Sequence, residues 1–145
     1  MVKEFQGQYR FLSNFWEALV QLDGQVYTSV EHAYQAAKSH DVHYRLSVLC
    51  ARTAGDAKRL GRKVALRPDW EDVKVDIMLG LLRQKFTEPK LARLLLATGE
   101  QELVEGNYWG DTFWGVCQGK GKNQLGKLLM QVRQEIMQPL VGSRI

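Results

Sequence analysis

The sequence predicts one compact α+β domain over residues 1–145, mainly helical, with a small N-terminal hairpin and short strands. Three observations lead to this fold class. Apolar and polar residues alternate around Asp23-Gly24, a pair that tolerates the positive φ values of a tight hairpin turn. Apolar residues then recur at helical spacing along most of the remaining chain. No repeat and no Pro/Gly/Ser-rich linker divides the sequence, so we expect a single domain.

The hairpin is expected over residues 16–30, and helices follow it. Thr28 and Glu31 have the spacing of a capping box, which predicts that the first helix starts there. Thr98-Gly99 is typical of a helix end, and a short strand is expected from Glu102 to Glu105. The expected helices run from about Ser29 to His40, Val42 to Ala51, Thr53 to Arg62, Asp69 to Phe86, Pro89 to Ala97 and Asn123 to Gln138.

Composition restricts the partners. The net charge of +4 suits an anionic ligand but is too small for an extended nucleic-acid groove. No apolar run approaches the roughly 20 residues that cross a bilayer, and the first residues lack the apolar core of a secretion signal. We therefore expect a cytoplasmic protein without a membrane partner. The basic run from Lys58 to Lys63 is either a solvated helix end or a phosphate clamp.

The segment from Asn107 to Gly126 combines two tryptophans, a carboxylate and five glycines ahead of a predicted helix. Aromatic faces can enclose a flat base or sugar, so Trp109 and Trp114 are candidate stacking residues, although such rings also serve as packing. Asp111 lies between them and is a candidate general acid or base, or else a turn-forming residue. This mixture indicates a phosphorylated sugar or nucleotide as ligand.

The GKGKN stretch that ends at Asn123 matches neither the P-loop nor the dinucleotide fingerprint. Lys120 and Lys122 are expected to hold a phosphate group together with the N-terminal amides of the last helix. Asn123 is counted with them among the substrate-binding residues. Arg10 and Lys63 are further phosphate candidates.

Glu31, Tyr34 and Lys38 recur at positions i, i+3 and i+7, which places them on one face of the first predicted helix. Long side chains at Glu31 and Lys38 can enclose one ribose from there. Each of the two charged residues also has a purely structural alternative. Glu31 suits the acidic position of the capping box, and Lys38 suits a cation near a helix C-terminus.

Metal and cofactor motifs are missing from the sequence. His32, His40 and His43 do not form an HExxH arrangement, so we expect a mechanism without metal and without cofactor. Cys50 and Cys117 do not form a CxxC pair and are expected to be small buried hydrophobic residues. Without a GxSxG motif, acyl transfer is not expected.

Several motifs occur in order from about Phe5 to Ile136 and resemble the NADAR superfamily of YbiA-like proteins. The resemblance implies a compact, mainly helical α+β fold. The motifs are FLSNF at Phe11 to Phe15, SVEHAYQAAK at Ser29 to Lys38, AKRLGRKVAL after Asp56, Trp70 before VKVDIMLGLLRQKF, LLLATG at Leu94 to Gly99, LVE at Leu103 to Glu105, DTFWG at Asp111 to Gly115, and GKNQLGKLLMQVR.

The resemblance also implies an activity, the hydrolysis of the N-glycosidic bond between ribose and an amine or base. The expected substrates are the ribosylamino-pyrimidine phosphates of riboflavin biosynthesis. The alternatives are removal of ADP-ribose from guanine in nucleic acid, a non-catalytic ADP-ribose-binding module, and a regulatory scaffold. The partner is then a phosphorylated ribosyl small molecule or an ADP-ribosylated base, with nucleic acid entering only as a modified substrate.

Residue roles follow from the same resemblance. Glu31 and Trp114 fall on positions that the family uses for catalysis or binding, and Lys38 matches a lysine proposed to attack ribose C1 and form a Schiff base. Asn14 and Phe15, in the FLSNF motif, are expected to bind substrate. Riboflavin-type members carry an aspartate after Trp-Gly, where this chain has Val116, so that role passes to Asp111 or is absent. We expect Glu31 and Trp114 to face one solvent-accessible hollow.

Overall fold

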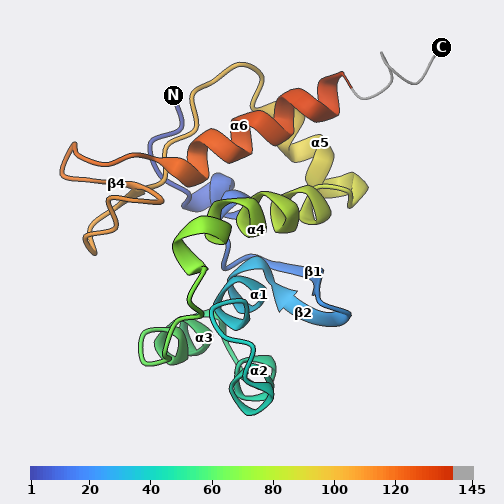
Figure 1. The fold of residues 1–145 in the computed structure, drawn as a ribbon. Helices are drawn as coiled ribbons and strands as arrows, with labels where there is room; N and C mark the ends of the chain where they lie inside the picture. The colour runs from blue at the N-terminus through green and yellow to red at the C-terminus, as the bar shows by residue number, and fades with distance from the viewer. Residues whose placement is uncertain (139–145) are drawn as a thin grey trace. The chain divides into compact units, whose positions relative to one another are not determined.

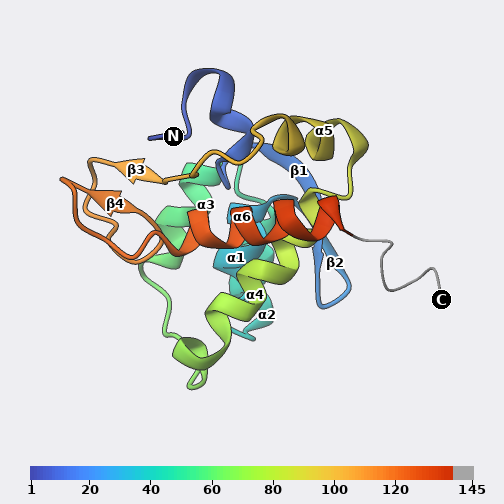
Figure 2. The ribbon, with the colours of Figure 1, turned by 90° about the horizontal axis from the view of Figure 1, so that it is seen from above.

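The computed structural model describes residues 1–138, and the chain divides into two compact units. One unit comprises Met1–Ser13 together with the chain from Phe86 onward, and the other comprises Asn14–Lys85. Figures 1 and 2 show the elements of each unit. Glu31 and Lys38 belong to the unit Asn14–Lys85, whereas the segment from Asn107 to Gly126 belongs to the other unit.

The unit Asn14–Lys85 begins with the predicted hairpin. Strands β1 (Glu17–Leu22) and β2 (Gln25–Ser29) pair antiparallel. The turn between them places Asp23 at φ 49° and Gly24 at φ 84°, the two successive positive values of a type I′ turn. The hairpin prediction is therefore confirmed.

Helix α1 (Val30–Ala36) is the centre of this unit. It contacts both strands and also helices α2 (Val42–Leu49), α3 (Ala54–Gly61) and α4 (Trp70–Lys85), and Figure 1 shows it surrounded by the hairpin, α2 and α3. Every residue of α1 is buried. The side chains of α1 therefore pack against neighbours on several sides, which restricts their movement. A rigid helix of this kind can position functional groups accurately.

The start of α1 differs from the prediction. Ser29, not Thr28, is the N-cap residue, and its hydroxyl accepts a hydrogen bond from the His32 backbone N–H. Glu31 is therefore the second helical residue, one position before the place that a capping box requires. The capping-box interpretation of Glu31 is wrong, because Ser29 already supplies the cap.

The end of α1 also differs, because the helix stops at Ala36 rather than at His40. Asp41 starts α2 by accepting hydrogen bonds from the backbone N–H groups of His43 and Tyr44, so the chain must turn before it. Lys38 lies in this turn, with its backbone N–H bonded to the Gln35 carbonyl at 3.2 Å. Its position thus depends on the turn as well as on the helical repeat.

The other unit contains the 3₁₀-helix η1 (Gly7–Leu12) and the helices α5 (Pro89–Ala97) and α6 (Gln124–Met137). Helix α5 has the predicted bounds and packs on both η1 and α6. Gly99 follows it at φ 66°, which confirms the predicted left-handed helix end. On α6, helical spacing predicts that Leu125, Leu128, Leu129, Val132 and Ile136 face inward; the first four are buried and Ile136 is partly exposed.

The expected strand from Glu102 to Glu105 does not form; only Leu103 makes an isolated bridge, to Val2. The parallel strands are instead β3 (Gly106–Asn107) and β4 (Val116–Cys117), which lie side by side in Figure 2. Asn123 explains the difference, because its side chain bonds the Glu105 N–H at 2.9 Å and the Leu103 carbonyl at 2.9 Å. A side chain thus satisfies backbone groups that a strand partner would otherwise bond.

Candidate functional site

Glu31 is a buried carboxyl group near the start of α1, with 7% of its surface exposed. Its backbone N–H donates to the Asn14 carbonyl oxygen at 3.1 Å, which fixes the first turn of the helix. One carboxyl oxygen, Oε2, accepts a hydrogen bond from Gln35 Nε2 at 2.5 Å. Because the cap is supplied by Ser29, the carboxyl group of Glu31 is not the group that caps the helix.

The surroundings of Glu31 favour its protonated form. Burial raises the pKa of this carboxyl group, because a charge is poorly solvated there. The hydrogen bond from Gln35 and the charges of Lys58, Lys38 and His32 act in the opposite direction without cancelling the rise. A carboxyl group that keeps its proton closer to neutral pH is suited to general acid catalysis.

Lys38 is partly buried in the turn after α1. Its Nζ lies 3.5 Å from the Gly61 carbonyl oxygen and 5.7 Å from the centre of the Tyr34 ring. Burial lowers the pKa of this amine, and the nearby Glu31 carboxyl group opposes the effect by raising it. A larger fraction of neutral amine, the nucleophilic form of lysine, is the consequence.

Aromatic rings line the same unit near these two residues. Tyr34 is buried against Trp70 of α4, with ring centres 5.2 Å apart. Phe15 is 46% exposed, and its ring centre lies 5.9 Å from Lys58 Nζ of α3. Asn14 is buried, its Nδ2 lies 3.5 Å from the Met78 sulfur, and its Oδ1 has no hydrogen-bond partner among residues 1–138. The structure thus brings Glu31, Lys38 and Tyr34 together.

Two residues of this cluster were not singled out from the sequence. Gln35 donates a hydrogen bond to the Glu31 carboxyl group, and its i, i+4 spacing from Glu31 on one helix face is the pattern that would have indicated it. Lys58 was considered only as part of a basic run. Its influence on Glu31 comes from the packing of α3 on α1, which no local pattern reveals.

We expect the substitution Glu31→Gln to raise the free energy of unfolding at pH 7 by on the order of 1 kcal/mol, the usual gain when a functional site is relaxed. A carboxyl group whose pKa is raised by folding contributes stability below its unfolded pKa, and that contribution is lost as pH rises through the folded pKa. The advantage of the variant should therefore shrink toward pH 4. Urea unfolding followed by circular dichroism from pH 4 to 7.5 measures the difference in the free energy of unfolding between the two proteins. Parallel pH curves of that free energy would contradict the expectation.

Asp111 occupies a tight turn in the other unit. Its Oδ1 accepts hydrogen bonds from the backbone N–H groups of Phe113 at 3.1 Å and Trp114 at 2.9 Å. The Asn107 side chain holds the backbone of Asp111 from both sides, accepting from its N–H and donating to its carbonyl oxygen. These contacts are those of a turn-forming aspartate. A catalytic role for Asp111 stays a prediction.

The two predicted stacking tryptophans lie in different surroundings. Trp109 is 45% exposed and makes an edge contact with Tyr108, with ring centres 5.2 Å apart. Both rings line a surface pocket of about 510 Å³ beside β3 and β4. Trp114 is partly buried and makes a similar edge contact with Phe113 at 4.9 Å. The more accessible of the two indoles is therefore Trp109.

The start of α6 is not open to a phosphate group in the way predicted. The backbone N–H of Gln124 donates to the Phe113 carbonyl at 3.1 Å, and that of Leu125 donates to the Trp114 carbonyl at 2.9 Å. These two N-terminal amides are thus already bonded, and the binding of a phosphate group by Lys120 and Lys122 stays a prediction. Lys120 and Lys122 are exposed, and Lys122 Nζ lies 5.6 Å from the Phe113 ring centre.

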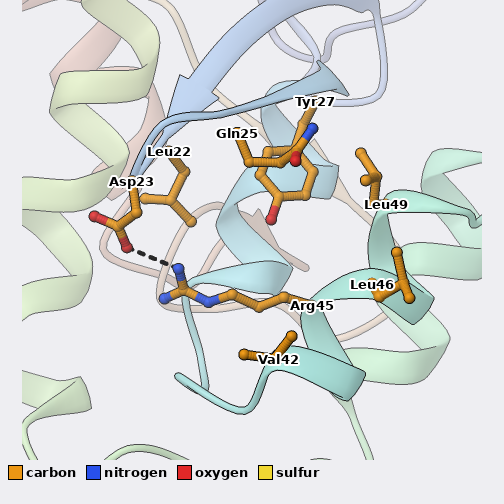
Figure 3. Close-up of a pocket in the computed structure, with 8 residues that line it drawn as sticks. All are labelled: Leu22, Asp23, Gln25, Tyr27, Val42, Arg45, Leu46 and Leu49. Carbon is orange, nitrogen blue, oxygen red and sulfur yellow. Dashed lines mark hydrogen bonds and ion pairs between the residues drawn. The ribbon is translucent and has the colours of Figure 1, made fainter.

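A second pocket, of about 310 Å³, lies between the hairpin turn and α2 (Figure 3). Arg45 forms an ion pair with Asp23 at 2.7 Å on one side of it, and this partner holds the pKa of Asp23 below its ordinary value. No residue of the predicted site lines this pocket. Its lining consists of Leu22, Asp23, Gln25, Tyr27, Val42, Arg45, Leu46 and Leu49.

The remaining sequence expectations have mixed outcomes. Cys50, the C-cap residue of α2, is exposed and Cys117 is partly exposed, so the expectation that both are buried is wrong. Within residues 1–138, no cluster of three or more His, Cys, Asp or Glu side chains is arranged to bind a metal ion. No helix in this range has both the length and the apolarity to traverse a bilayer.

The comparisons with known proteins identify the family. The family model of the NADAR domain matches residues 2–137. The chain belongs to the NADAR family. The resemblance inferred from the motifs is thereby confirmed, and the match covers both compact units.

Named NADAR relatives extend this result. The N-glycosidase YbiA of Escherichia coli is 39% identical over 88% of this chain and 82% of its own length. The N-glycosidase Npun_R5314 of Nostoc punctiforme is 40% identical over 88% of this chain and 86% of its own length. The riboflavin biosynthesis protein VVA0006 of Vibrio vulnificus is 42% identical over 88% of this chain, which spans only 36% of that relative.

A solved structure supports the fold class directly. The NMR structure of the E. coli protein YbiA matches with a TM-score of 0.81 at 36% sequence identity, over 97% of this chain and 90% of the other. The predicted α+β class, mainly helical with short strands, is therefore confirmed.

Proposed function

We propose that this NADAR protein is an N-glycosidase that hydrolyses the bond between a phosphorylated ribose and the amine of a pyrimidine. The reaction class is supported by the relatives named N-glycosidase, which this chain matches over most of their length. They do not favour the alternatives of a binding module without activity or of an enzyme for ADP-ribosylated guanine. The observation that carries the mechanism is the buried Glu31 carboxyl group with its raised pKa.

The substrate class is supported by relatives named for riboflavin biosynthesis, in Vibrio vulnificus and in maize. The chain spans 36% and 23% of those two proteins, so the support concerns the NADAR part of each. A ribosylamino-pyrimidine phosphate is a small ribosyl compound, and the modest positive charge of the chain suits its phosphate group. The reaction would take place in the cytoplasm.

The chemistry required is the cleavage of a ribosyl C–N bond. As the bond breaks, positive charge develops on the sugar, and the departing nitrogen needs a proton. Glu31 supplies that proton, and its carboxylate then stabilises the positive charge on the sugar. Its raised pKa keeps the proton available at a pH at which an ordinary glutamate has lost it.

Lys38 acts as the nucleophile in this proposal. Its neutral amine attacks ribose C1, the C1–N bond breaks, and the electron pair leaves with the nitrogen as that atom takes the proton from Glu31. The resulting lysine glycosylamine loses a proton, and its ribose ring opens at the C1–O4 bond to give the Schiff base. Water then hydrolyses the Schiff base, which releases the ribose phosphate and restores the free amine of Lys38. The lowered pKa of the amine, caused by burial, supports this step. Direct attack by water is the alternative route.

The remaining roles are carried by residues that sequence motifs indicate. Asn14, Phe15 and Tyr34 contact the ribose, and Asp111 orders a water molecule or a sugar hydroxyl group. The sequence motifs also predict Trp109 and Trp114 as stacking residues and Lys120, Lys122 and Asn123 as further substrate-binding residues.

We expect Trp114→Ala to raise KM about tenfold and to lower kcat less, because base stacking on an aromatic ring contributes about 1–3 kcal/mol to binding. Steady-state kinetics with the ribosylamino-pyrimidine phosphate measures both constants. Trp16→Ala is the matched control, since Trp16 is an exposed indole outside the predicted site. A loss confined to kcat would contradict a binding role for Trp114.

The proposed function is tested by two substrates side by side. Purified protein is incubated with ribosylamino-pyrimidine phosphate and, separately, with DNA that carries ADP-ribosylated guanine, and free base is measured by chromatography. We expect rapid release of the pyrimidine and little release from DNA. Release from DNA alone would transfer the assignment to the ADP-ribose alternative, and nucleotide binding without release from either substrate would indicate a binding module.

A further inference from the structure

Gln35 occupies an unusual position beside the Glu31 carboxyl group. It lies one helical turn further along α1, only 3% of its surface is exposed, and its Nε2 donates to Glu31 Oε2 at 2.5 Å. The bond is short and buried, so it restricts the rotation of the Glu31 side chain. Gln35 is thus built into the same rigid helix as the group that it holds.

The other half of the Gln35 amide has no bond. Its Oε1 is buried and has no hydrogen-bond partner among residues 1–138. Buried polar atoms are normally bonded, so an unbonded one calls for a physical reason. In the observed orientation the amide directs its donor at Glu31 and leaves its own oxygen without a bond. The orientation of Gln35 therefore serves Glu31 rather than its own bonding.

Gly61, at the end of α3, presses against this amide. A Cβ atom at Gly61 would overlap Gln35 Oε1, would lie 2.6 Å from Gln35 Cδ and would come within 3.3 Å of Lys38 Nζ. The backbone of Gly61 does not have a positive φ, so the glycine is not required by its conformation. It is required by close approach, because only a residue without a side chain leaves room for the Gln35 amide.

We propose that Gln35 is the positioning residue for Glu31, holding its carboxyl group in the reactive orientation, and that Gly61 in turn fixes the amide of Gln35. This inference rests on the proposed function of Glu31. The proposed role of Gln35 is exerted through Glu31, since its donor is directed at Glu31 and its amide is packed against α3.

The charged groups around Glu31 define what a titration will report. His32 of α1, Lys38 in the turn after α1 and Lys58 of α3 all act on the Glu31 carboxyl group through their charges. Lys74 of α4 and Arg62, after α3, act on Lys38. Removing the Gln35 donor leaves all these charges in place. A change in the titration of Glu31 would then report the lost hydrogen bond.

The direct test is Gln35→Met, which keeps the length of the side chain and removes the donor. The pKa of Glu31 is measured by NMR of protein with ¹³C-labelled glutamate side chains. Because the bond from Gln35 lowers the pKa of Glu31, we expect the value to rise in the variant. We also expect kcat/KM to fall about tenfold, the factor for one lost hydrogen bond to a charged group, with the corresponding limb of the pH–rate profile moved to higher pH. An unchanged Glu31 titration together with an unchanged limb would overturn the proposal.

Gly61→Ala tests whether Gly61 fixes the amide of Gln35. Gly80→Ala is its matched control, because a Cβ at Gly80 meets nothing within 4 Å. Both glycines lie in helices, where alanine is the better helix former. We expect Gly61→Ala to move the Glu31 titration as Gln35→Met does, and Gly80→Ala to match the wild type. If Gly61→Ala does not fold, Gln35→Met alone decides the proposal.

The NMR titration separates this inference from the proposed function. A wild-type protein that releases no base, in which Gln35→Met still raises the pKa of Glu31, would refute the N-glycosidase assignment and keep the contact between Gln35 and Glu31 as described. A wild-type protein that releases base, with a Glu31 titration unaffected by Gln35→Met, would keep the function and refute the positioning role.

Discussion

Glu31→Gln is expected to lower kcat by about 10²–10⁴-fold, the range that a positioned general acid or base contributes. Glutamine has the same shape but cannot deliver a proton to the departing nitrogen, so KM should change little. The rate is measured as release of free pyrimidine from the ribosylamino-pyrimidine phosphate. The variant should also be the more stable protein at neutral pH, so a loss of activity cannot be attributed to unfolding.

Glu17→Gln is the control for this prediction, because Glu17 is an exposed carboxylate in the same unit. It should leave kcat unchanged. A Glu31→Gln protein that retains a tenth or more of the wild-type rate would show that another group protonates the leaving nitrogen. Asp111 would then be the next carboxyl group to test.

Lys38→Ala is expected to lower turnover by about 10²-fold or more, comparable to the loss of one preorganised catalytic group. In the wild type, borohydride added during turnover should reduce the Schiff base and leave a ribosyl group on Lys38. Mass spectrometry of the digested protein locates the adduct. Because burial lowers the pKa of the Lys38 amine, the covalent yield should remain high below the pH at which an exposed lysine loses its proton.

Lys90→Ala is the control, since Lys90 is an exposed lysine of α5. It should retain both turnover and the adduct. A wild-type protein that turns over without any adduct on Lys38 would exclude the covalent route. Direct attack by water, assisted by Glu31, would then account for the reaction.

The secondary structure could be predicted wherever a local pattern determined it. The Asp23-Gly24 turn, the bounds of α5 and the glycine after it depend on backbone conformations that few residues adopt. The first helix was harder to place because Thr28 and Ser29 are both good N-caps, and the structure uses Ser29. The strand expected at Glu102 does not form because a distant side chain, that of Asn123, bonds its backbone.

The candidate site could be predicted in part. Glu31, Tyr34 and Lys38 share a face of one helix, so their proximity follows from the helical repeat. Gln35 and Gly61 depend on how closely α3 approaches α1, a distance that no single segment encodes. The expectation that Glu31 and Trp114 face one hollow stays a prediction, and so does the organisation of the chain as a single domain.

The pH dependence of kcat/KM, compared between the wild type and Glu31→Gln, tests most directly whether a buried carboxyl group on α1 drives the reaction. We predict that activity in the wild-type profile falls at high pH with a midpoint above 4.5, the ordinary pKa of a glutamate, and that the residual activity of the variant lacks this fall. pH profiles of the same shape for the wild type and Glu31→Gln would contradict a catalytic role for the Glu31 carboxyl group.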